Sequence, residues 1–192
     1  DEAVGGLVGK NFNGTVTECY AGSSATGDDE AGGLVGVNSE GGAISRCWAS
    51  GPVVADGDGA GGLLGTNSYG AAVSYCYSLG SVRGESRVGG LVGANLTGAA
   101  IAQCYSTGSV SGESDTVGGL VGFNYDGEIS SGYWDRDRSG LEVMCGSEGV
   151  GGSGCDDAGG KTTVEMMRQG TFPDWDFIGV WNIGEDQTYP YL

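Results

Sequence analysis

The 192-residue sequence predicts an all-β protein: a right-handed parallel β-helix, or β-solenoid, of about five coils of about 28 residues, with a C-terminal cap that contains one short helix. Three observations predict this class. The stretch Gly-Gly-Leu-Val-Gly, once Gly-Gly-Leu-Leu-Gly, recurs at steps of 27, 29, 28 and 29 residues. Other side chains recur in the same register, and the apolar segments between them are short and bounded by glycine. A fixed period of this size is typical of stacked units that bury their apolar faces only against their neighbours.

Each unit contains three apolar segments. The first begins at the glycines Gly5, Gly32, Gly61, Gly89 and Gly118, and an asparagine stands six residues later each time: Asn11, Asn38, Asn67, Asn95 and Asn124. The second is centred on Val16, Ile44, Val73, Ile101 and Ile129, followed three residues later by Cys19, Cys47, Cys76, Cys104 and Gly132 and then by Tyr20, Trp48, Tyr77, Tyr105 and Tyr133. The third and weakest carries Val53, Val82 and Val110. None has a helical period, so we expect parallel strands whose like side chains stack about 4.8 Å apart. A propeller or sandwich fits less well, because it needs longer strands joined by hairpin turns.

The Gly-Gly-Leu-Val-Gly segment has two adjacent apolar columns. Side chains alternate between faces along a strand, so if the leucines point inward the next residues point outward. The predicted outward column is Val8, Val35, Leu64, Val92 and Val121. Such a flat apolar strip would pack on another segment or another copy of the protein.

The second segment does not alternate cleanly. The residues directly before the cysteine position are too varied for a core: Glu18, Arg46, Tyr75, Gln103 and Ser131. A bulge or a corner within the segment would each explain this, and the sequence leaves both open.

The charge is strongly negative, with 8 basic and 25 acidic residues and a net charge of −17. Such a surface repels nucleic acid and anionic membranes, and no apolar run approaches 18 residues, so we expect neither nucleic-acid binding nor membrane insertion. Acidic residues gather in the turn before each glycine-rich stretch. Calcium bridging between coils is one interpretation, and we favour the other, a solvated acidic rim.

The six cysteines, without any histidine, favour disulfides or buried thiols over zinc sites. Cys145 and Cys155 bracket a glycine-rich loop, and we predict a disulfide between these two cysteines. Such a disulfide indicates an oxidising compartment. For the stacked cysteines two interpretations stay open: disulfides Cys19–Cys47 and Cys76–Cys104, or a column of reduced thiols. Asn13-Gly-Thr15 and Asn95-Leu-Thr97 are glycosylation sequons.

The repeat pattern ends after residue 132, so we divide the chain into a solenoid, 1–132, and a capping region, 133–192. Asp135, Asp137 and Ser139, with Gly140, match the first half of a calcium loop, and Glu142 lies near the missing distal ligand. Calcium is the one cofactor this indicates; the alternative is a surface turn with Arg–Asp pairs.

Farther on, Thr162 and Glu165 predict a capping box for a helix over 162–169, with Gly170 as its stop.

The first coil has no corresponding cap. We expect its edge to meet more repeats, another domain or another subunit. The first residue is Asp, so the sequence is expected to be a processed product or an excised piece.

The Gly-Leu-Val-Gly repeats, the asparagine after them, the Cys-Tyr segment and the tail from Tyr133-Trp-Asp to Tyr189-Pro-Tyr-Leu192 resemble the GLUG-motif repeat proteins. The resemblance implies secreted or surface-anchored bacterial or archaeal proteins, often adhesin-like, or the accessory region of some immunoglobulin A peptidases. It supplies no catalytic residues. Without histidine, a Ser or Cys nucleophile also lacks its usual base, so we do not expect an enzyme.

These observations predict a non-enzymatic extracellular structural or adhesive protein: a cell-surface adhesin segment, or a filament subunit that packs through its first coil and apolar wall. Two alternatives are a non-catalytic module of a larger secreted hydrolase, acting on peptides or glycans, and a solenoid that binds a glycan or host surface through its aromatic residues.

Overall fold

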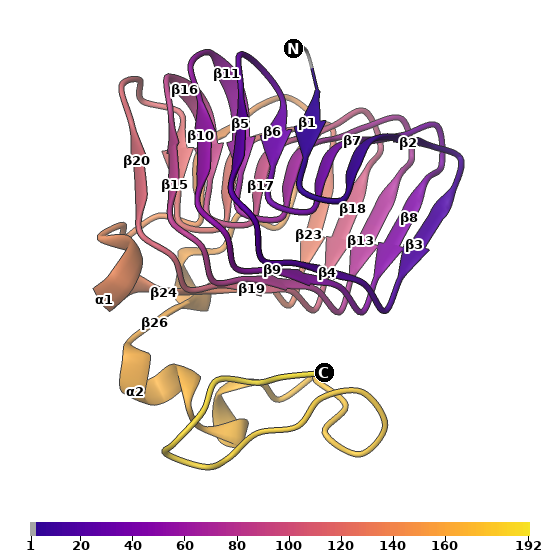
Figure 1. Ribbon diagram of the computed structural model, residues 1–192. Helices are drawn as coiled ribbons and strands as arrows, with labels where there is room; N and C mark the ends of the chain where they lie inside the picture. Colours follow the sequence, from indigo (N-terminus) through magenta and orange to yellow (C-terminus); the bar gives the residue numbers. More distant parts are fainter. Residues whose placement is uncertain (1–2) are drawn as a thin grey trace.

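Each repeat forms one coil in the computed structural model, which describes residues 3–192 (Figure 1). The short strands of a coil pair in parallel with the same strands of the next coil, for example Asn38 with Asn67 and Tyr77 with Tyr105. Leu34 N donates to Leu63 O, and Leu63 N to Leu91 O, at 2.9 Å each. The fold is therefore a right-handed parallel β-solenoid of about six turns, as the sequence predicts.

Five parallel sheets form the walls. The first contains β1 (Val4–Gly5), β6 (Ala31–Gly32), β11 (Asp58–Gly61), β16 (Ser86–Gly89) and β21 (Val117–Gly118). The second, here called the Asn sheet, contains β2 (Val8–Phe12), β7 (Val35–Ser39), β12 (Leu64–Asn67), β17 (Val92–Leu96), β22 (Val121–Tyr125) and β25 (Cys145–Glu148). The third contains β3 (Thr15–Thr17), β8 (Ala43–Ser45), β13 (Ala72–Ser74), β18 (Ala100–Ala102) and β23 (Glu128–Ser130).

The two remaining sheets complete the coil. The fourth, here called the aromatic sheet, contains β4 (Tyr20–Ala21), β9 (Trp48–Ala49), β14 (Tyr77–Ser78), β19 (Tyr105–Ser106), β24 (Tyr133–Asp135) and β26 (Gly160–Lys161). The fifth contains β5 (Ala25–Gly27), β10 (Val53–Ala55), β15 (Val82–Gly84) and β20 (Val110–Gly112). Inside, one apolar core joins the Leu, Ile and Cys columns, and a smaller one lies between the fifth and first sheets.

The predicted outward apolar strip is wrong. Val35, Leu64, Val92 and Val121 are fully buried, and so is the neighbouring leucine column from Leu34 onward. The chain bends between β6 and β7, so Leu34 and Val35 do not belong to one alternating strand and both enter the core. The second glycine permits this bend, because a Cβ on Gly33 would lie 2.2 Å from Gly62 O. Val8, in the first coil, is only partly buried.

A corner, and not a bulge, explains the irregular second segment. The residue before each cysteine position lies in the left-handed region, with φ between 49° and 53°: Glu18, Arg46, Tyr75, Gln103 and Ser131. One left-handed residue turns the chain sharply. The apolar residue before the corner and the cysteine after it therefore both reach the core, while the corner side chain points out.

The asparagines form a buried ladder. Asn38 Nδ2 donates to Asn67 Oδ1 at 3.0 Å, and the same contact repeats from Asn67 to Asn95 and from Asn95 to Asn124. The same nitrogen also donates to a carbonyl in the following turn, such as Gly42 O at 3.1 Å. Each asparagine thus closes its own turn and joins it to the next coil.

The solenoid continues past residue 132. In the chain after α1 (Arg136–Ser139), β25 pairs with β22 and β26 pairs with β24, with η1 (Asp157–Gly159) between them. Met144 O accepts from Leu120 N, and Cys145 pairs with Val121, so Val-Met-Cys-Gly repeats the motif geometry in a partial sixth turn. The solenoid wall therefore reaches Lys161, beyond the boundary expected at 132.

The last thirty residues form a tail that runs along the flank of the solenoid (Figure 1). It contains α2 (Thr163–Met166) and η2 (Gln169–Thr171), and the predicted Thr162–Glu165 capping box is present. The predicted end at Gly170 is wrong, because α2 ends at Met166 and Gly170 lies within η2. Aromatic residues of the tail pack against the aromatic sheet. Within residues 3–192, no helix is long and apolar enough to cross a membrane.

Candidate functional site

The first coil has an exposed edge, here called the open edge, formed by β1 to β5. Its apolar side chains reach solvent: Leu7 is 51 % exposed, Phe12 59 % and Tyr20 65 %. Leu34 and Leu63, which occupy the Leu7 position in the next coils, are 0 % exposed. The open edge is thus the surface at which the interior pattern of the solenoid meets water.

The hydrogen bonds of the Asn ladder all run in one direction, which makes the open edge different from the far end of the solenoid. Asn11 Nδ2 donates to Asn38 Oδ1 at 2.8 Å, and within residues 3–192 its own Oδ1 accepts no hydrogen bond. At the far end, Asn124 Nδ2 donates to the carbonyls of Gly127 and Ser153. The ladder therefore presents an acceptor at the open edge and ends on backbone oxygens at the closed end.

The cysteine column has the same polarity. The backbone N–H groups of Cys19, Cys47 and Cys76 each donate to the sulfur of the next coil at 3.4 Å. Cys19 Sγ, at the open edge, donates to Thr17 O and accepts nothing within the described chain. Another coil placed on this side would supply the missing donors to both columns.

The aromatic column is stacked. Ring centroids are 4.8 Å apart for Tyr20 and Trp48, 5.8 Å for Trp48 and Tyr77 and 5.0 Å for Tyr77 and Tyr105, with planes within 7° of parallel. Trp48 and Tyr77 therefore have a stacked ring on both faces, whereas Tyr20 has a stacked ring on one face only. Where the tail ends, a cavity of about 580 Å³ remains, lined by Glu18, Cys19, Tyr20, Arg46, Trp48, Gly179, Val180 and Leu192.

Burial changes the acidity of the column. It raises the pKa of Tyr77 and raises that of Tyr105 well above its usual range, because the ionised phenolate would be buried. The tail contributes to this burial, because the ring centroid of Trp181 lies 6.1 Å from that of Tyr77 and 6.0 Å from that of Tyr105. A glycan could stack on one ring face only, so the geometry does not favour a glycan platform along the column.

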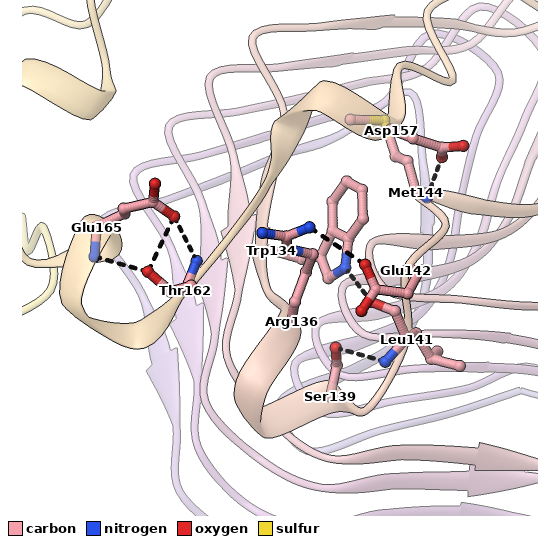
Figure 2. Close-up of polar contacts among 9 residues, drawn as sticks. All are labelled: Trp134, Arg136, Ser139, Leu141, Glu142, Met144, Asp157, Thr162 and Glu165. Atoms are coloured by element: carbon pink, nitrogen blue, oxygen red, sulfur yellow. Dashed lines mark hydrogen bonds and ion pairs between the residues drawn. The ribbon is translucent and has the colours of Figure 1, made fainter.

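The predicted calcium loop has another role, and Figure 2 shows two of its contacts, Ser139 with Leu141 and Glu142 with Arg136. Asp135 is fully buried and accepts from Arg138 N at 3.1 Å, as the N-cap of α1, and from Thr163 Oγ1 at 2.7 Å. Ser139 Oγ accepts from Leu141 N, and Glu142 pairs with Arg136 at 3.2 Å.

Asp137 completes this set, because its Oδ2 accepts from Thr163 N at 2.9 Å. The four side chains predicted as ligands thus all contact donors of the protein, which corrects the calcium interpretation. Within the described residues, no three His, Cys, Asp or Glu side chains form a cluster that could hold a metal.

The acidic rim contains cross-coil contacts. Asp58 N donates to Asp29 Oδ1 at 3.0 Å, Ser86 Oγ hydrogen-bonds to Asp58, and Arg87 pairs with Asp58 at 3.3 Å. Arg87 and Asp58 are both about half exposed, so this pair contributes little to stability. The contacts are those of a solvated rim with partial charge pairing.

The two sequons differ in accessibility. Asn95 is fully buried in the Asn ladder, and its Nδ2 donates to Asn124 Oδ1 and Ala99 O, so the folded chain cannot be glycosylated there. Asn13 is exposed in a turn with φ of 52° and stays a candidate.

The cysteines divide into two groups. Cys145 and Cys155 form a disulfide, whereas the four stacked cysteines are free thiols. The structure therefore selects the thiol column over the two predicted ladder disulfides. The hydrogen bond from Cys76 lowers the pKa of Cys47 to about 7, and burial raises the pKa of Cys76 well above its usual range.

Comparison with known families identifies one motif. Residues 1–28 and 84–111 match the family model described as the GLUG motif. No curated protein and no solved structure matches the chain. The two matched segments lie in the first coil and around the fourth, and the β-solenoid that contains them has the architecture of a structural repeat module.

Proposed function

We propose that this chain is a non-catalytic extracellular structural module. Its solenoid, which contains two GLUG-motif segments, is closed at one end, and the open edge at the other end docks onto a further coil of the same kind. The observation that carries the proposal is the contrast between the two ends of the solenoid. At one end Leu7 and Tyr20 are exposed, and at the other β25 and β26 pair with the last full coil.

The polarity of the ladders defines the partner. Asn11 Oδ1 and Cys19 Sγ need donors, so a fitting coil offers an asparagine Nδ2 and a backbone N–H in the same register. Two open edges placed face to face would bring acceptor against acceptor. Head-to-tail stacking of identical chains is also disfavoured, because β25 and β26 cover the far end.

An extracellular, adhesin-like location is part of the proposal. The Cys145–Cys155 disulfide is typical of oxidising compartments, and Asn13 lies in an exposed sequon. The strongly acidic surface suits a soluble repeat stack outside the cell. Antibody labelling of intact source cells, compared with permeabilised cells, tests this location. Labelling that requires permeabilisation would refute it.

An added coil tests the docking. A second copy of residues 31–59, inserted directly before Val4, would continue every ladder, because Val4 pairs with Ala31 and Gly61 with Gly32. We expect the midpoint of thermal unfolding to rise and the amide of Leu7 to become protected from hydrogen exchange.

The matched control carries the same 29 residues after Leu192, where they cannot join the ladders. We expect this chain to unfold as the original does, with Leu7 unprotected. Equal midpoints for the two extended chains would show that the open edge does not accept a like coil.

A further inference from the structure

The free thiols of Cys19, Cys47, Cys76 and Cys104 form a column of repeated geometry. Each sulfur lies 3.1 Å from the carbonyl oxygen two residues earlier, so the four side chains share one orientation. Neighbouring sulfurs are therefore separated by the coil spacing, about 4.8 Å. This is more than twice the length of a disulfide bond.

That separation suits a two-coordinate metal ion. A metal–sulfur bond is about 2.3 Å long, so two collinear bonds span about 4.6 Å. Thiolates select soft ions such as Cu(I). A tetrahedral ion such as Zn²⁺ would need further ligands, and the described residues provide no cluster of three or more.

The cavity beside Cys19 provides the access. Cys19 is half-buried and lines the 580 Å³ cavity together with Arg46, whereas Cys47, Cys76 and Cys104 are fully buried, so an ion would reach the column past Cys19. Cys47 Sγ also accepts the N–H of Cys19 at 3.4 Å, a contact that stabilises a thiolate. Arg46 supplies positive charge beside the cavity, where a bis-thiolate site would carry one net negative charge.

We propose that Cys19 and Cys47 bind one soft monovalent cation of the Cu(I) or Ag(I) class between their sulfurs. On binding, each thiol loses its proton to solvent, two metal–sulfur bonds form and the ligands of the free ion leave. No electrons are transferred, and the S–H contact of each thiol with its carbonyl is given up.

Silver ion is the probe, because it requires no reductant that would attack the Cys145–Cys155 disulfide. The full chain with this disulfide intact is titrated with Ag(I) and followed by native mass spectrometry and thermal unfolding. We expect one tightly bound equivalent, with two protons displaced, and a higher unfolding midpoint.

Variants assign the site. Cys19→Ser and Cys47→Ser are each expected to weaken binding of the first equivalent at least tenfold, while Cys104→Ser, at the far end of the column, binds as the original does. Circular dichroism confirms that each variant is folded, and Cys47→Ala repeats the test without a hydroxyl. Unchanged affinity in folded Cys47→Ser and Cys47→Ala, or a lower unfolding midpoint with Ag(I), would overturn the proposal.

Discussion

Tyr189 donates a 2.6 Å hydrogen bond to the carboxylate of Asp135, 54 residues earlier in the chain. Asp135 also accepts from Arg138 N and Thr163 Oγ1, so one buried carboxylate joins β24, α1, α2 and the C-terminal tail. This contact fixes the start and the end of the tail to the same point of the solenoid. It also explains how a carboxylate can be fully buried at this point.

Replacing Asp135 by Asn is expected to destabilise the chain by about 2–3 kcal/mol, because hydrogen bonds to a charged acceptor are lost in a buried site. Tyr189→Phe should cost about 1–2 kcal/mol for the same reason. Urea unfolding followed by tryptophan fluorescence measures both. Tyr191→Phe, at a side chain that is 47 % exposed, is the control and should change stability by less than about 0.5 kcal/mol.

The same contacts predict the response to a chelator. The oxygens of Asp135, Ser139 and Glu142 bind donors of the protein, so EDTA is expected to leave the unfolding midpoint unchanged. A midpoint that falls with EDTA and recovers with added calcium would restore the calcium interpretation. Differential scanning calorimetry is the measurement.

The left-handed corner predicts an unusual substitution pattern at Glu18, where φ is 53°. Glu18→Gly should be neutral or stabilise by up to about 1 kcal/mol, and Glu18→Val should destabilise by about 1–2 kcal/mol, because a β-branched residue resists this conformation. At Arg83, an exposed residue in the extended strand β15, the order should reverse, with Gly the less stable variant. Chemical denaturation of the four variants gives the comparison, and the same order at both positions would contradict the corner.

The leucine column and the column next to it are both buried, so truncating adjacent side chains of the two columns should destabilise the protein equally. Leu63→Ala and Leu64→Ala should each cost about 2–5 kcal/mol, because both side chains are 0 % exposed. Leu7→Ala, the same motif position in the first coil, should cost far less, because Leu7 is 51 % exposed. A small loss at Leu64 alone would restore an outward-facing strip.

Alkaline pH is expected to release the tail. Burial raises the pKa of Tyr105 above the value of about 10 for an unfolded tyrosine, so its contribution to stability is complete below that pH and is lost as the pH rises through the folded-state pKa. Tyr105 also donates to Pro190 O at 2.5 Å. Tyr105→Phe should therefore be less stable at pH 7 but lose less stability between pH 9 and about 12. Unfolding curves across this range test the difference, and parallel losses in both proteins would exclude Tyr105 as the cause.

Much of the solenoid could be predicted from the sequence, because in-register recurrence reports directly on stacking. The pairing of Asn38 with Asn67 and of Tyr77 with Tyr105 is confirmed. The outward strip was wrong because strand alternation was applied across a bend between Leu34 and Val35. The corner residues were identifiable as irregular, but their variety concealed a shared backbone conformation.

The tail and the Asp135 site could not be predicted in the same way. No repeat relates Tyr189 to Asp135, and alternating oxygens in Asp-Arg-Asp-Arg-Ser resemble a metal loop as well as a helix cap. The partial sixth turn was missed because Met144 and Cys145 take the places of Leu and Val while the spacing shortens. Only three-dimensional contacts distinguish these cases.

The tail makes the chain mechanically unequal along its length. It packs around the rings of Tyr77, Tyr105 and Tyr133, which belong to three successive coils, whereas Tyr20 of the first coil lies outside this cluster. Tension applied at the N-terminus would therefore detach the first coil at low force, before the coils that the tail stabilises. A tether made from such modules would yield in small steps before it failed.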